Sequence, residues 1–105
     1  MSVNSDSGKV IIEKEAVKYT HSFQSKYPNA TKAYFVGLEK INLILEQENC
    51  IGVRIYDGYN SETKKENRVI VGVDHQGEDM IEGVIVEELT SCPNHCPKSS
   101  SLLKK

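Results

Sequence analysis

Residues 51–73, IGVRIYDGYNSETKKENRVIVGV, contain two runs that predict β-strands. From Ile51 to Ile55, apolar β-branched residues alternate with other residues, which is the two-residue repeat of a half-buried strand. The second run, Val69-Ile70-Val71-Gly72-Val73, is dense in β-branched residues, which favour strands. Residues 57–67 are polar and predict a loop. Because so short a connection cannot join parallel strands, we expect an antiparallel hairpin.

Two helices are predicted upstream of this hairpin. Apolar residues recur at three- and four-residue steps from Lys9 to Tyr27, and Pro28 ends the pattern. The hydroxyl of Ser7 is placed to cap this helix. The second helix has an apolar stripe formed by Leu38, Ile41, Ile44 and Leu45.

Two shorter segments leave alternatives open. Residues 33–36 form either the first turn of the second helix or a short strand. Residues 84–86 predict a third strand, with a helix running towards Leu89 as the alternative. The fold class that follows is α+β, with two helices packed on a small antiparallel sheet of two to three strands. The helices are needed because a bare hairpin is marginally stable in water.

With 105 residues, the chain can bury one modest core. We expect a flexible leader over residues 1–8, because this segment is rich in Ser, Asn and Gly. A single α+β domain should follow over residues 9–90. Residues 91–105 predict an irregular tail rich in Cys, Pro, Ser and Lys.

The formal net charge of −2 argues against nucleic acid or an anionic membrane as the main partner. No segment has the apolar length needed to span a bilayer, and the N-terminal residues lack the pattern of a secretory signal. We therefore expect a cytoplasmic location. Thiols stay reduced there, so the three cysteines are expected to be free thiols or metal ligands.

The cysteines and one histidine form the first candidate site. Cys92 and Cys96 lie in a proline-bracketed loop, and Cys50 stands at the start of the first predicted strand. If the tail folds back, the three thiolates could hold zinc or an iron–sulfur cluster with His95 or His75 as the fourth ligand. The alternative is that Cys50 is a small apolar core residue and the tail cysteines are surface thiols.

A redox interpretation uses the same loop. His95 and Lys98 could stabilise a thiolate at Cys96, and a pair with this spacing can close a disulfide if the loop bends. The strand-then-helix setting that is typical of disulfide oxidoreductases is missing.

The second candidate site lies on the strands. Arg54 and Arg68 are the only arginines, and they fall on the two strands expected to pair. An arginine fork binds carboxylate or phosphate at two points, so these residues and Tyr56 could form a ligand or partner site. The alternative is a solvated sheet face on which Arg54 pairs with a neighbouring acid such as Asp57 or Glu66.

Residues 74–79 gather three carboxylates and a histidine. These residues could form a hard-cation or acid/base site, but a tight turn at Gly77 is the favoured interpretation. The acidic residues from Glu78 to Glu88 are uninterrupted by Lys or Arg, which predicts a solvated face or a docking surface for a basic partner.

Residues 44–56, together with Val71-Gly72-Val73-Asp74 and the Cys-Pro-x-x-Cys tail, resemble a family of small uncharacterised bacterial proteins. This resemblance implies a compact cytoplasmic protein and no particular activity. The chain is also similar in length and element order to the A-type iron–sulfur carriers, which implies Cys50, Cys92 and Cys96 as cluster ligands. The tail differs from the Cys-Gly-Cys of those carriers, and Cys50 precedes its strand instead of following it.

The sequence therefore predicts a small non-catalytic, cytosolic binding or protein-interaction module without a cofactor. Its partner would be another protein or a second copy, through the sheet edge or the helices. The most distinctive surface comprises Arg54, Tyr56 and the Cys92–Cys96 loop. The alternative is a metal-binding or iron–sulfur carrier protein, and a thiol-dependent enzyme centred on Cys96 is the third hypothesis.

Overall fold

A computed structural model describes residues 3–105 of the chain and divides it into two compact units. Unit 1 contains the leader up to Ser7 and Phe35–Thr90. Unit 2 contains Gly8–Tyr34 and Ser91–Lys105. The first two residues of the predicted leader lie outside the described residues.

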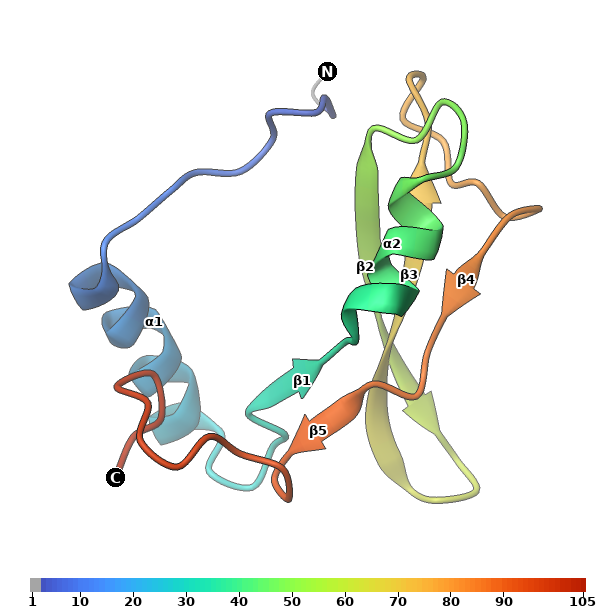
Figure 1. Cartoon of the computed structure of the whole chain (residues 1–105). Coiled ribbons are helices and arrows are strands. Elements are labelled where there is room, and N and C mark those ends of the chain that lie inside the picture. Colours follow the sequence, from blue (N-terminus) through green and yellow to red (C-terminus); the bar gives the residue numbers. More distant parts are fainter. Residues whose placement is uncertain (1–2) are drawn as a thin grey trace. The chain divides into compact units, whose positions relative to one another are not determined.

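Unit 1 is organised around the predicted antiparallel hairpin. Its strands are β2 (Gly52–Asn60) and β3 (Lys65–Val73), which pair without interruption from Gly52↔Val73 to Asn60↔Lys65 (Figure 1). The strands therefore extend into most of the predicted loop, and only residues 61–64 turn the chain. Beyond the core, the ladder is continued by cross-strand polar pairs, which stabilise a ribbon without burying apolar surface.

A third, short strand completes this sheet. β4 (Ile85–Val86) pairs antiparallel with β3, so the strand order is β2-β3-β4. The prediction of a strand at residues 84–86 is confirmed, and the helical alternative is wrong. β2 thus lies at one edge of the sheet.

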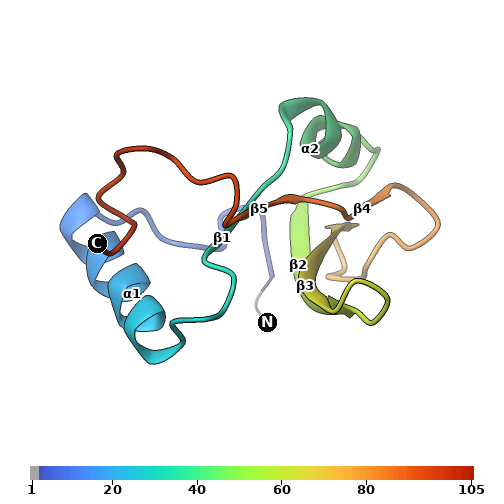
Figure 2. The ribbon, with the colours of Figure 1, turned by 90° about the horizontal axis from the view of Figure 1, so that it is seen from below.

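One helix covers this sheet. α2 (Leu38–Leu45) contains the predicted apolar stripe and lies on one face of the β2–β3 ribbon (Figures 1 and 2). Its Ile44 is 0% exposed and packs against Gly72, where an added Cβ would lie 3.2 Å from Ile44 Cγ2. The α+β class is confirmed by two helices and two small antiparallel sheets.

Gln47 joins the end of this helix to the segment that leads into β4. Its Nε2 donates to the Ile44 carbonyl at 2.9 Å, and its Oε1 accepts from the Val84 amide at 2.8 Å. A side chain at position 83 would displace this amide, because a Cβ there would lie 2.0 Å from Gln47 Oε1. This amide therefore satisfies buried backbone groups at both places.

Unit 2 is built on α1 (Glu13–Lys26). The helix ends before Pro28, as predicted, but it begins four residues later than Lys9 and has no side-chain cap at Ile12. The expected Ser7 cap is wrong. The Ser7 hydroxyl instead accepts a hydrogen bond from the Asn4 amide at 3.0 Å, within a turn of the leader.

The C-terminal segment lies against α1 in unit 2 (Figures 1 and 2). Before it, β5 (Thr90–Cys92) pairs with β1 (Ala33–Phe35) in a two-stranded sheet. Of the two alternatives for residues 33–36, the strand is confirmed and the first turn of a helix is wrong. The prediction of an irregular tail holds from Pro93 onwards, whereas the strand at its start was not predicted.

Candidate functional site

Arg54 and Tyr56 project from the same face of β2, because they are two residues apart. They stand opposite Val71 and Val69 of β3. Gly72 belongs to the other face, which α2 covers. The two candidate side chains are therefore on the side of the sheet away from the helix.

Asp79 binds both of these side chains. Arg54 Nη1 lies 2.5 Å from Asp79 Oδ1, and the Tyr56 hydroxyl donates to Asp79 Oδ2. Both terminal nitrogens of Arg54 also donate to the Gly77 carbonyl at 3.3 Å. The guanidinium is thus bound by acceptors within the protein. This agrees with the alternative interpretation of the sequence, in which Arg54 pairs with a neighbouring acid.

The turn between β3 and Asp79 positions this carboxylate. Asp74 Oδ1 accepts the amides of Gln76 and Glu78 at 2.9 and 3.0 Å, and Gly77 adopts a φ of 80°, which glycine tolerates. The turn interpretation of residues 74–79 is confirmed. After the turn, Asp79 forms a β-bridge with Val73. This bridge places Asp79 beside β3, on the side away from β2, so Arg54 and Tyr56 reach its carboxylate across β3.

These contacts shift the pKa values of the three groups. The hydrogen bond from Tyr56, assisted by Arg54, holds the pKa of Asp79 below its usual range. The same hydrogen bond raises the pKa of Tyr56, because its proton is shared with the carboxylate. Asp79 also raises the pKa of Arg54. The Arg54–Tyr56–Asp79 cluster therefore stays in one charge state across the neutral range.

We expect Asp79→Asn to destabilise the protein in a pH-dependent way. Folding lowers the pKa of Asp79, so its stabilising contribution is fully present above the unfolded value of about 3.9. This contribution is lost as the pH falls through the lower folded value. The difference in urea-induced unfolding between wild type and variant should therefore be largest above about pH 4 and shrink in acid.

Glu78→Gln is the matched control, since it removes the same charge from an exposed neighbour. In addition, ¹³C NMR of the tyrosine rings should show that the pKa of Tyr56 falls towards its ordinary value in Asp79→Asn. A stability difference that does not change with pH, or a Tyr56 titration unaffected by the substitution, would contradict the cluster.

The third predicted residue of this site, Arg68, lies elsewhere. It is directly opposite Asp57 in the ladder, and its Nε is 3.1 Å from Asp57 Oδ1. This pair belongs to the face of the sheet that does not carry Arg54 and Tyr56. The structure thus brings together two of the three predicted residues and adds Asp79.

Sequence reasoning missed Asp79 because it was assigned to a run of solvated acids. Its distinguishing signal was its place directly after a tight turn at Gly77. A chain that reverses at the end of a strand runs back beside that strand, and an acid there can reach a base on the neighbouring strand.

The leader residues of unit 1 line a depression at the start of β2. Its volume is about 360 Å³, and its walls come from residues 51–54, from Val73 and from the leader residues Val3, Asn4, Ser5 and Ser7. Arg54 forms part of this wall. The described part of the predicted flexible leader therefore lies beside the sheet.

The cysteines differ from the expectation of free thiols. Cys92 and Cys96 form a disulfide in unit 2, so that expectation is wrong for these two residues. Cys50 is free and belongs to unit 1, where its thiol donates to the Gly52 carbonyl at 3.2 Å. The loop has bent as the redox interpretation requires.

Over residues 3–105, no group of three or more His, Cys, Asp or Glu side chains is arranged to hold a metal ion. Zinc and iron–sulfur ligation require thiolates, which disulfide sulfurs cannot supply. The metal site of Cys50, Cys92, His95 and Cys96 therefore stays a prediction for the reduced chain only.

Comparisons with protein-family models, curated proteins and solved structures found no match to this chain. The resemblances to small bacterial proteins and to A-type carriers accordingly stay predictions. Neither α1 nor α2, which are the helices of the described residues, has the length and apolar character to cross a bilayer.

Proposed function

We propose that this protein is a non-catalytic, cytoplasmic protein-interaction module that pairs with a second copy along the β2 edge. The observation that carries the proposal is the length of this edge from Ile55 to Asn60, because the leader lies beside residues 51–54 only. A protein surface suits the near-neutral net charge better than a nucleic acid does.

β2 is an unusually open edge strand. Its nine residues pair with β3 on one side, and within residues 3–105 no strand pairs with the other side. Soluble proteins normally protect such an edge with Lys, Pro, a bulge or a short strand. β2 contains no Lys and no Pro, and its pairing with β3 has no bulge. The outer side of β2 can therefore accept another strand along Ile55–Asn60, and over the whole strand once the leader beside residues 51–54 is displaced.

The charges of β2 are already compensated within unit 1. Arg54 is paired with Asp79, and Asp57 with Arg68. A second strand could therefore dock without leaving an unpaired charge in the interface, which would be costly. The two ion pairs also hold the side chains of Arg54 and Asp57 in place on β2.

The side chains of β2 provide apolar area for such a contact. Ile55 is 58% exposed and Tyr59 is 64% exposed, although both stand on a strand. Two copies of β2 that pair antiparallel about Tyr56 would overlap over all nine residues. This register places Val53 of one copy opposite Tyr59 of the other, and aromatic pairs with β-branched residues stabilise sheets.

We expect the double variant Ile55→Lys/Tyr59→Lys to weaken dimerisation. Lysine on an edge strand opposes pairing through charge repulsion, and both positions are exposed in the monomer. Sedimentation velocity over a range of concentrations should show a wild-type dimer whose dissociation constant rises at least about tenfold in the variant, about 1.4 kcal/mol.

Ile81→Lys is the control, because Ile81 is an exposed isoleucine outside the strands. This variant should dimerise like wild type. A wild-type protein that sediments as a monomer at all concentrations would contradict the proposal, as would a double variant that dimerises normally.

A further inference from the structure

We propose that the Cys92–Cys96 disulfide is an exchange-active redox site that reacts with a dithiol through Cys96 and sets how firmly the C-terminal segment is held on α1. This inference is independent of the β2 interface. It starts from the unequal exposure of the two half-cystines.

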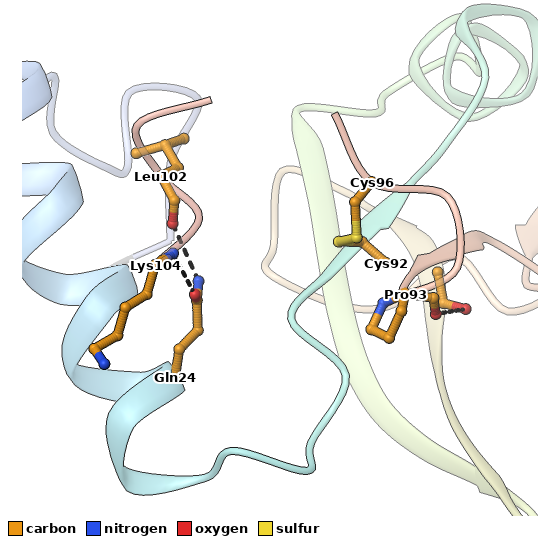
Figure 3. The surroundings of a disulfide bond; sticks show 7 residues. Gln24, Cys92, Pro93, Cys96, Leu102 and Lys104 are labelled. Carbon is orange, nitrogen blue, oxygen red and sulfur yellow. Dashed lines mark hydrogen bonds between the residues drawn. A yellow bond between two sulfur atoms is a disulfide. The ribbon is translucent and has the colours of Figure 1, made fainter. Parts of the chain in front are cut away.

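Only one sulfur-bearing residue of the pair is open to solvent. Cys92 is 2% exposed, whereas Cys96 is exposed. Figure 3 shows the disulfide that joins them. Cys92 is also fixed by the backbone, because its carbonyl accepts the Lys32 amide at 2.7 Å. Thiol–disulfide exchange depends on access to the attacked sulfur, so a reagent should attack at Cys96.

The exchange can be written with all atoms and electrons balanced. A thiolate of the dithiol attacks Cys96 Sγ, the Cys92–Cys96 bond breaks, and Cys92 leaves as a thiolate. The second thiol of the dithiol, as its thiolate, then attacks the sulfur that is bound to Cys96. Cys96 leaves as a thiolate, and the dithiol becomes a disulfide. The protein has gained two electrons, and its two thiolates take up protons according to their pKa values.

The charges around the loop favour thiolates. His95 precedes Cys96, Lys98 follows it closely, and there is no Asp or Glu from residue 89 to residue 105. A positive neighbour such as Lys98 stabilises both an attacking and a leaving thiolate. In the proposed cytoplasmic location, moreover, disulfides are usually transient and redox-active rather than structural.

Gln24 holds the segment that follows this loop. It is 6% exposed, and its side-chain amide binds the extended chain at two points (Figure 3). Its Nε2 donates to the Leu102 carbonyl at 3.1 Å, and its Oε1 accepts the Lys104 amide at 2.8 Å. The Ser101 hydroxyl donates to Glu13, and the Ser101 carbonyl lies 2.9 Å from His21 Nε2.

The disulfide links this segment to β5. Cys92 is the last residue of the strand, and Cys96 begins the run that reaches Gln24. Reduction removes this cross-link, so that the loop keeps only its own hydrogen bonds, such as the one from the His95 amide to the Ser91 carbonyl, and the bonds on α1 hold the segment that follows. Reduction of the disulfide should therefore lower the protection of the Lys104 amide against hydrogen exchange.

The exchange is tested on the full chain carrying Cys50→Ser, with dithiothreitol and glutathione as the thiol probes. The native disulfide should be reduced by dithiothreitol without denaturant, as seen by alkylation and mass spectrometry. Cys92→Ser should leave a Cys96 thiol that reacts with oxidised glutathione at least about tenfold faster than the Cys92 thiol in Cys96→Ser. Equal rates, or a disulfide reduced only in denaturant, would overturn the exchange site.

Amide hydrogen exchange tests whether the disulfide affects how firmly the C-terminal segment is held on α1. It is measured on the chain that retains both Cys92 and Cys96. On reduction, the Lys104 amide should exchange several-fold faster, while amides of β3 in unit 1 keep their rates. Unchanged protection of Lys104 would overturn the coupling between the disulfide and the C-terminal segment.

Discussion

Ile44→Ala should lower the free energy of unfolding of unit 1 by about 2–5 kcal/mol. Ile44 is the only large side chain in the described residues that is completely buried. It stands on the face of α2 that packs against β3, next to Gly72. Truncation there removes apolar contacts and leaves a cavity that the backbone of the sheet cannot fill.

This change is measured by urea-induced unfolding followed by circular dichroism, with hydrogen exchange of β3 amides to report on unit 1 specifically. Leu43→Ala is the control, because Leu43 is the neighbouring, half-exposed residue of the same helix. It should cost less than about 1 kcal/mol. Equal losses in the two variants would show that α2 does not pack on the sheet through Ile44.

Gly72→Ala should destabilise the same unit by about 1–3 kcal/mol through overpacking. The added Cβ would lie 3.2 Å from Ile44 Cγ2, 3.2 Å from Cys50 Sγ and 2.9 Å from Gln47 Nε2. These atoms belong to the buried seam between α2 and β3. Displacing the Gln47 amide would also weaken its hydrogen bonds to the backbone.

Gly52→Ala is a matched control from the paired strand. A Cβ at Gly52 meets no atom within 4 Å, so alanine there should be neutral or stabilising by up to about 1 kcal/mol. The comparison is made by urea unfolding of both variants. A larger loss in Gly52→Ala than in Gly72→Ala would contradict the packing of the helix on this side of the hairpin.

The hairpin and α2 could be predicted because their side-chain periods reflect burial. Val69–Val73 alternate between two covered surfaces, and the stripe of α2 matches the face that contacts them. The outer part of β2 was predicted as a loop because its residues are polar. Strand pairing there depends on cross-strand partners such as Asp57 and Arg68, which single-strand patterns do not reveal.

The start of α1 was predicted too early for a related reason. Ile12 continues the helical spacing, yet it is exposed, so the pattern there does not mark a buried face. The spacing of apolar residues alone cannot show whether their side chains are buried in the fold. The end of the helix at Pro28 was predictable, because proline restricts the residue before it.

The candidate sites depended on long-range contacts to different degrees. Arg54 and Tyr56 were found from their residue types, whereas Asp79 required knowledge of how the chain returns beside β3. The disulfide was mispredicted because compartment rather than geometry was used to decide the state of Cys92 and Cys96. Local spacing alone had allowed this bond.

The central claim, that β2 pairs with β2 of a second copy, is tested most directly by isotope-filtered NMR on a mixture of labelled and unlabelled protein. We predict intermolecular contacts between backbones along Gly52–Asn60, symmetric about Tyr56. Intermolecular contacts that avoid this strand, or their absence at the highest soluble concentration, would contradict the claim.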